Sequence, residues 1–184
     1  MNPHIKILIL NWNGEHLLRP CLSSVLKIDY CNYSVMLIDN GSNDKSVKMV
    51  KDYYPSVEIL ELERNYGYSG GYNRCFKILK NDYLGFILLL NNDTEVDPDI
   101  LQSFINAKKK YGDKNLFGGK IFYHNNPKKI WYAGGNIKLK YLKISHRGIR
   151  KYDSDIYNKP CKTDYITGCC LFTSIEIMNH LSGF

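Results

Sequence analysis

Four short segments rich in Asn, Asp and Gly carry the residues with which this sequence could bind a polar ligand. They span residues 11–14, 39–44, 65–73 and 91–97. Such residues also make ordinary turns, so chain reversal accounts for any one of them alone. Each segment follows an expected strand, and ligands of open α/β sheets bind beyond the carboxyl ends of the strands. The four together therefore indicate a binding site.

Segment 91–97, which follows the most hydrophobic strand, has the residues best suited to bind a metal. Magnesium prefers oxygen ligands and commonly takes one or two protein carboxylates together with substrate phosphates. Asp93 could be that carboxylate, with Asn91 or Asn92 supplying a neutral hydrogen bond. The alternative is a turn and cap before the next helix. Asp97 accounts for the cap, but it leaves Asp93 without a structural role.

Two other residues fit a nucleoside. The Asp39 carboxylate could accept the imide N–H of uracil or thymine or bind a sugar hydroxyl, although an Asx turn explains it equally well. Trp12 could pack against a base or lie in the core. The glycines of 67–71 would let backbone approach a ligand closely. The sequence holds no G-x-G-x-x-G, P-loop, G-x-S-x-G or H-E-x-x-H pattern, which argues against the ligands and reactions of those motifs.

Composition limits the class of protein. The chain has 184 residues with 44% hydrophobic and 23% charged residues, which suits one globular domain. A net charge of +7 favours an anionic partner: a nucleotide diphosphate, a nucleic acid or an acidic membrane surface. The longest apolar run, 86–90, is too short to span a membrane. The six cysteines form no C-x-x-C pair and are interpreted as reduced thiols of a cytoplasmic protein.

Strands and helices are expected to alternate through the first part of the chain. The predicted strands span 5–10, 34–38, 57–62 and 84–90, with amphipathic helices between them. Pro20 predicts a late start or a kink in the first helix, and Ser42 or Asn43 is the expected cap of the second. The second helix should bury Val47, Val50, Tyr53 and Tyr54. In the third, Tyr72, Cys75, Phe76 and Leu79 should share one face after a glycine-rich loop, 65–71.

This alternation predicts an α/β fold, an open and mostly parallel sheet with helices on both faces. Beyond residue 118 the regular alternation of strands and helices ends. Short strands are expected near 119–123 and 165–173, on either side of a loop-rich basic stretch, 127–162. The lysines at 108–110 are interpreted as a solvated helix end, where cations suit the helix dipole.

Taken together, five stretches resemble the family 2 glycosyltransferases of GT-A fold, in particular the rhamnosyltransferase-like members that build bacterial surface polysaccharides. The matching stretches occur in family order at residues 9–14, 38–42, 65–73, 89–94 and 164–170. The resemblance implies that Asn91-Asn92-Asp93 corresponds to the D-x-D motif, with Asp93 as the ligand of a divalent metal, Mg or Mn. Asn91 replaces its first Asp. Tyr72 and Cys75 also depart from the family, which often has Asn or Arg and Gly there.

The resemblance assigns further residues to two groups. The implied nucleotide-binding residues are Asn11, Trp12, Asp39, Asn65, Gly70, Gly71, Asn73, Asn91 and Asn92. The implied donor-sugar and acceptor pocket contains Trp131, Gly134, Gly135, Gly168 and Cys169. A carboxylate general base is expected beyond Phe184, so no catalytic residue is assigned. The resemblance thus divides a C-terminally incomplete domain, 1–184, into a nucleotide-sugar half, 1–117, and the start of an acceptor-side half, 118–184.

The implied reaction transfers a sugar, with inversion, from a dTDP- or UDP-sugar such as a rhamnose donor. The acceptor would be a saccharide or a lipid-linked sugar, used in cell-surface polysaccharide synthesis in the cytoplasm, at the inner face of the membrane. A sugar nucleotidyltransferase is disfavoured because no basic glycine-rich loop follows the first strand. A non-catalytic nucleotide- or carbohydrate-binding module remains open, and a nucleic-acid binder comes last.

Overall fold

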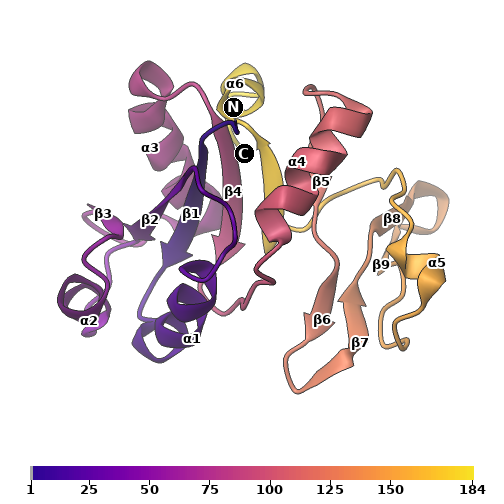
Figure 1. Cartoon of the computed structure of the whole chain (residues 1–184), viewed down its shortest axis with the longest axis horizontal. Coiled ribbons are helices and arrows are strands. Elements are labelled where there is room, and N and C mark those ends of the chain that lie inside the picture. The colour runs from indigo at the N-terminus through magenta and orange to yellow at the C-terminus, as the bar shows by residue number, and fades with distance from the viewer. Residues whose placement is uncertain (1) are drawn as a thin grey trace.

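The computed structural model describes residues 2–184, apart from the side chains of residues 81 and 82. Its centre is a six-stranded sheet in the order β3-β2-β1-β4-β10-β5 (Figure 1). These strands are β1 (Ile5–Asn11), β2 (Tyr33–Asp39), β3 (Glu58–Glu61), β4 (Phe86–Asn91), β5 (Phe117–Gly118) and β10 (Cys170–Ser174). β1 to β4 pair in parallel, whereas β10 runs antiparallel to β4 and β5. β10 begins later than the strand predicted over 165–173.

Helices cover both faces of the sheet. α1 (Glu15–Val25), α2 (Ser46–Tyr53) and α4 (Ile100–Tyr111) pack in one apolar cluster with Ile7 and Ile9 of β1. α3 (Gly67–Asp82) and α6 (Ile175–His180) pack in a second cluster with Leu8. Successive side chains of a strand point to opposite faces, so one buried strand serves both clusters. Within residues 2–184, no helix combines the length and the apolarity needed to cross a bilayer. The predicted α/β fold is confirmed.

The chain after β5 forms two small antiparallel ribbons. β6 (Ile121–Tyr123) pairs with β7 (Asn126–Tyr132), and β8 (Gly135–Lys138) pairs with β9 (Lys143–His146). A 3-10 helix, η1 (Leu139–Tyr141), joins β8 to β9, and α5 (Asp155–Asn158) comes later. Figure 1 shows this region at the end of the molecule away from α2 and β3. The loop-rich stretch predicted over 127–162 is therefore wrong, because buried Ile130 and Tyr132 anchor β7.

The start of α1 differs from the expectation based on Pro20. α1 begins at Glu15 and continues through Pro20, so the predicted late start is wrong. A proline inside a helix removes one backbone hydrogen bond. Burial of Leu18, Cys21 and Leu22 offsets that cost, since all three side chains are essentially inaccessible.

The predicted cap of α2 is also wrong. The helix begins at Ser46, beyond both Ser42 and Asn43. The Asp44 carboxylate accepts hydrogen bonds from the backbone N–H groups of Ser46 and Glu15, at 2.9 and 3.0 Å. Burial alone would raise the pKa of Asp44, but these hydrogen bonds and one from the Ser46 hydroxyl outweigh it, so the net pKa is lowered. One carboxylate thus holds the starts of α1 and α2 together.

Two further details of the helices depart from the sequence pattern. In α2, Met49 is buried beside Val50, whereas Tyr53 is exposed and does not belong to the apolar face. α3 begins at Gly67, so most of the predicted glycine-rich loop, 65–71, is helical. The buried face predicted for α3 is confirmed by the second apolar cluster.

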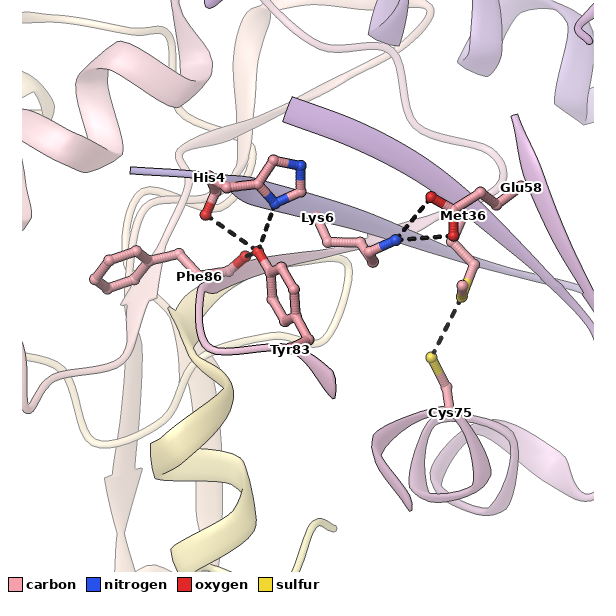
Figure 2. A network of polar contacts seen from close by, with 7 residues as sticks. All are labelled: His4, Lys6, Met36, Glu58, Cys75, Tyr83 and Phe86. Carbon is pink, nitrogen blue, oxygen red and sulfur yellow. Dashed lines mark hydrogen bonds and ion pairs between the residues drawn. The ribbon is translucent and has the colours of Figure 1, made fainter. Parts of the chain in front are cut away.

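A polar network lies at the amino-terminal edge of the sheet (Figure 2). Nζ of Lys6 in β1 donates to both carboxylate oxygens of Glu58 in β3 at 2.8 Å, reaching across β2. The Tyr83 hydroxyl lies 3.1 Å from the carbonyl oxygen of His4 and 2.7 Å from that of Phe86. Burial, followed by the nearby Lys6 charge, lowers the pKa of His4. The network fastens the end of the sheet opposite to the candidate site.

Candidate functional site

A cleft of about 300 Å³ opens where β1, β2 and β4 end. Eight residues line it: Leu10, Trp12, Asn40, Asn65, Gly67, Tyr68, Asn91 and Asn92. Four of these residues are asparagines, so the lining offers both hydrogen-bond donors and acceptors beside apolar surface. Its position agrees with the rule that ligands of open α/β sheets bind beyond the carboxyl ends of the strands.

Buried amides and one carboxylate lie beneath the cleft. Nδ2 of Asn11 lies 3.4 Å from Oδ1 of Asp39 and 3.3 Å from Oγ of Ser42, while its Oδ1 accepts a 2.8 Å hydrogen bond from Nδ2 of Asn92. Asp39 Oδ2 also accepts the backbone N–H of Ser42 at 3.0 Å. A side chain at Gly14 would collide with both Asn11 and Asn92. The absence of a Cβ there makes room for this network between β1 and β4.

Asn40 holds residues 65–67, at the start of α3, which form one wall of the cleft. Its Oδ1 accepts the backbone N–H of Tyr66 at 3.0 Å. Its Nδ2 donates to Oδ1 of Asn65 at 2.9 Å and to the carbonyl oxygen of Gly67 at 3.1 Å. Asn65 Oδ1 accepts the N–H of Gly67 as well, at 2.8 Å. The loop before α3 is therefore fastened to the end of β2 by side-chain amides, which positions Asn65 at the cleft.

The segment that precedes β10 contacts two residues that line the cleft, Tyr68 and Asn91. The Tyr68 hydroxyl donates a 2.7 Å hydrogen bond to the carbonyl oxygen of Gly168. Asn91 contacts Cys169, with its Nδ2 3.3 Å from Sγ. Burial, with a smaller effect of Cys169, raises the pKa of Tyr68, so this phenol stays protonated and can donate at neutral pH. These contacts bring Gly168 and Cys169 to the rim of the cleft.

Asp93 occupies the turn directly after β4 and is exposed. Among the described side chains, those of residues 2–80 and 83–184, no three His, Cys, Asp or Glu gather into a group that could hold a metal ion on their own. A lone, accessible carboxylate next to an amide-lined cleft suits a cation that takes its other ligands from a bound diphosphate. Asp93 therefore fits a shared metal site, whereas a cage made only of protein ligands does not fit.

The structure brings together only part of the predicted nucleotide set. Trp12, Asn65, Asn91 and Asn92 line the cleft, while Asn11 and Asp39 lie buried beneath it. Gly70, Gly71 and Asn73 belong to α3 and do not line it. A Cβ at Gly71 would collide with Leu10, so this glycine permits close packing of α3 on β1. Asn73 instead exchanges hydrogen bonds with the backbone of Phe184.

The predicted donor-sugar and acceptor residues fall into two places. Gly168 and Cys169 reach the cleft through Tyr68 and Asn91. Trp131, Gly134 and Gly135 lie instead around the β7–β8 connection, where the Trp131 ring packs edge-on against His146. The Gly135 backbone bonds to Thr163. These three residues do not line the cleft, and their assignment stays a prediction.

Sequence reasoning missed three residues that line the cleft. Asn40 and Tyr68 lie in segments 39–44 and 65–73, and Leu10 lies in a predicted strand, but the sequence indicates no ligand contact for any of them. Asn40 follows Asp39 at the end of β2, where the strand-end rule already predicts a binding site. No local signal marks Tyr68, because its partner Gly168 is distant in the sequence.

The family described as Glycosyl transferase family 2 matches residues 6–181. The chain belongs to this family. A curated relative, the UDP-Glc:alpha-D-GlcNAc-diphosphoundecaprenol beta-1,3-glucosyltransferase WfgD of Escherichia coli, is 26% identical over 137 residues, which cover 70% of this chain and 53% of the relative. The poly-beta-1,6-N-acetyl-D-glucosamine synthase of Staphylococcus epidermidis is 27% identical over 97 residues, 52% of this chain and 23% of the relative.

Solved structures agree with the fold of this family 2 chain. The mannosyltransferase PcManGT of Pyrobaculum calidifontis, in complex with GDP-Man and Mn2+, has a TM-score of 0.64 at 16% identity and covers 100% of this chain and 48% of its own. S. aureus TarS in complex with UDP-GlcNAc has a TM-score of 0.51 at 20% identity over 58% of this chain and 31% of its own. This family 2 chain thus spans about half the length, or less, of these proteins.

Proposed function

We propose that this chain binds a nucleotide diphosphate sugar and transfers the sugar, with inversion, to a saccharide or lipid-linked acceptor. The observation that carries the proposal is the cleft at the carboxyl edge of the sheet, with the Asn11–Asp39–Asn92 network beneath it and Asp93 beside it. The motif order further favours a rhamnosyltransferase-like enzyme of bacterial surface polysaccharide synthesis, using a dTDP- or UDP-sugar. WfgD, which acts on a diphosphoundecaprenol-linked sugar, and the poly-beta-1,6-N-acetyl-D-glucosamine synthase support a role in glycan assembly.

The nucleoside would lie over the ends of β1 and β2. The Trp12 ring is 54% exposed at the cleft and is free to pack on a base, a contact that aromatic rings make favourably. Asp39 is almost fully buried, so a base imide or a ribose hydroxyl would reach its carboxylate only by donating into the network beneath the cleft. Asn40 and Asn65 already bond to each other, which preorganises the wall beside the nucleoside.

Asp93 would hold Mg or Mn together with the diphosphate. When bound, the metal would offset the negative charge that develops on the leaving diphosphate. PcManGT, whose complex contains GDP-Man and Mn2+, supports this assignment. Asn91 and Asn92 line the adjoining cleft and would orient the phosphates through neutral hydrogen bonds. A general base for the acceptor hydroxyl is not assigned to any residue of this chain.

The acceptor would approach from the side formed by residues 118–184, while residues 1–117 would hold the donor. Gly168 and Cys169 supply the part of this side that reaches the cleft. We place the reaction in the cytoplasm, at the inner face of the membrane, with peripheral membrane contact. A lipid-linked acceptor would be available there.

Calorimetric titration with UDP and dTDP, with and without manganese, tests the donor site. Manganese should tighten binding at least tenfold in the wild type, and Asp93→Ala should remove most of that gain. Asp97→Ala is the matched control, because Asp97 is an exposed acid in the same loop whose carboxylate only accepts the nearby N–H of Asp99. The proposal fails if neither nucleotide binds, or if binding is indifferent to both manganese and Asp93.

A further inference from the structure

The β8–η1–β9 hairpin carries four large apolar side chains that are mostly exposed to solvent. Leu139 is 78% exposed and Leu142 is 91% exposed, and Tyr141 and Ile144 are exposed as well. Soluble proteins rarely gather so many large apolar groups on one protruding element unless the element meets a partner. Leu142 also has a left-handed backbone, with φ 46°, at which glycine would cost less. The tip therefore holds a leucine where a plain turn would not need one.

The two faces of this hairpin differ in character. Ile137 lies directly opposite Ile144, and Lys138 lies directly opposite Lys143. Neighbouring pairs of a ribbon point to opposite faces, so one face presents isoleucines and the other presents lysines. Lys140 at the tip adds a third ammonium group next to the exposed leucines. The hairpin is thus amphipathic, with cations beside an apolar edge.

The charge of the whole chain is concentrated in this region. Residues 114–152 contain 10 of the 25 Lys and Arg residues and none of the 18 Asp and Glu residues. The rest of the chain therefore has 15 basic and 18 acidic residues, a slight excess of acid. The net charge of +7 comes entirely from the segment that contains the hairpin, so the partner of this segment should be anionic.

We propose that the hairpin docks the protein on an anionic lipid bilayer, with Leu139, Leu142 and Ile144 entering the interface and the lysines meeting lipid phosphates. Apolar groups beside basic ones give interfacial membrane binding, and each basic residue near an anionic surface adds to the attraction. A nucleic acid would gain from the lysines, but it offers no apolar phase for exposed leucines. The bilayer satisfies both groups.

This inference rests on the membrane contact proposed above and names the element that makes it. Gly134 and Gly135, proposed for the acceptor pocket, lie at the base of the hairpin. Figure 1 shows the hairpin at the end of the molecule away from α2 and β3. Docking through its tip would hold the acceptor-side half against the lipid surface, where a lipid-linked acceptor is presented.

Co-sedimentation with phosphatidylcholine vesicles, with and without phosphatidylglycerol, tests the docking. The wild type should bind only the anionic vesicles, and high salt should release it. Leu139→Gln with Leu142→Gln should lower the partition coefficient at least tenfold, since burial of a leucine is strongly favourable. Leu84→Gln is the control, because Leu84 is 98% exposed at another site and should have no effect.

A second comparison separates local from overall charge. The triple change Lys138→Gln, Lys140→Gln and Lys143→Gln should weaken binding to anionic vesicles roughly a hundredfold. The exposed lysines Lys27, Lys109 and Lys110, changed to Gln together, alter the net charge equally and should weaken it far less. Equal loss in both triple variants would overturn the proposal, as would failure of the wild type to bind.

Two measurements identify other occupants. Light scattering could show that the wild type is a dimer and that the Leu139→Gln, Leu142→Gln variant is a monomer. That result would assign the hairpin to contact with a second copy of the chain instead. Binding of single-stranded DNA that needs the lysines but not the leucines would assign it to nucleic acid. UDP titration of every variant should match the wild type, so loss of membrane binding and loss of the donor site are read separately.

Discussion

The hydroxyl of Tyr68 donates a 2.7 Å hydrogen bond to the carbonyl oxygen of Gly168, one hundred residues further along the chain. The bond joins the first turn of α3 to the segment that leads into β10. A Cβ at residue 168 would collide with the Tyr68 ring, so this approach requires glycine. The bond therefore links Tyr68, which lines the cleft, to a segment that is distant in the sequence.

Tyr68→Phe should loosen the far wall of the cleft without unfolding the protein. One hydrogen bond contributes about 1 kcal/mol net to stability. UDP binding should weaken by at most about fivefold, because the ligand would have to order the loosened wall. Amide hydrogen exchange at residues 167–169 should become faster. Tyr53→Phe, at an exposed tyrosine on α2, is the control and should change neither measurement. Unchanged exchange in Tyr68→Phe would show that the bond does not hold this segment.

Gly14→Ala should break the network beneath the cleft. The new methyl group would displace the Asn92 amide from Asn11 and leave buried polar atoms without partners, at a cost of about 1–3 kcal/mol in urea unfolding. Asn92→Ala removes the same hydrogen bond. If Gly14→Ala acts through Asn92, the two changes together should cost clearly less than their sum. Strict additivity in this cycle would contradict the mechanism.

Glu58→Gln should destabilise the protein more than Lys6→Met does. The Lys6 side chain is only 11% exposed, so loss of the Glu58 charge leaves a largely desolvated ammonium without its partner. Lys6→Met removes that charge and leaves the half-exposed Glu58 in contact with water. Breaking a buried pair costs more than replacing the buried charge. Urea unfolding should show a loss of about 1–3 kcal/mol for Glu58→Gln and a smaller one for Lys6→Met.

Three thiols should stay unreactive until the protein unfolds. Burial raises the pKa of Cys21, Cys75 and Cys170 from the ordinary 9.0 to about 12. Their thiolate fraction near pH 8 should therefore be roughly a thousandfold lower than that of an ordinary thiol. The exposed Cys31 and Cys161 should react with a disulfide reagent at once. Fast labelling of all six cysteines in the native protein would contradict this.

The same thiols give a pH dependence of stability with a defined sign. Folding favours the protonated thiol, so its contribution is fully present below pH 9, the ordinary thiol pKa, and is lost as pH rises toward about 12. The melting temperature should fall across this interval. In Cys75→Ala the melting temperature should decrease less steeply with pH, because one of the titrating groups is removed. An unchanged slope in that variant would exclude the thiol as a cause.

The central part of the fold was predictable because burial leaves a strong pattern. β4 is hydrophobic from Phe86 to Leu90 and lies between two neighbouring strands, as its sequence indicates. The spacing of Tyr72, Cys75 and Phe76 predicted the buried face of α3, which the structure confirms. Such patterns are local and come from residues that all face one core.

The details that sequence reasoning missed depend on distant partners. Asp44, not Ser42, holds the start of α2: its carboxylate accepts the N–H of Ser46 and also the N–H of Glu15 on another helix. The glycines after Asn65 are helical because Asn40 fastens the chain just before them. Neither partner can be identified from spacing. The same is true of the cleft, where the position of Tyr68 depends on its hydrogen bond to Gly168, far away in the sequence.

Because β10 lies between β4 and β5, the sheet cannot be completed until β10 has been synthesised. Leu88 of β4 pairs with Phe172, so the free edge of β4 must wait for a much later part of the chain to be synthesised. At ordinary translation rates that wait is on the order of ten seconds. During it, an apolar strand with an unpaired edge is open to pairing with other chains. We therefore expect the nascent protein to depend on chaperones until residue 174 has left the ribosome.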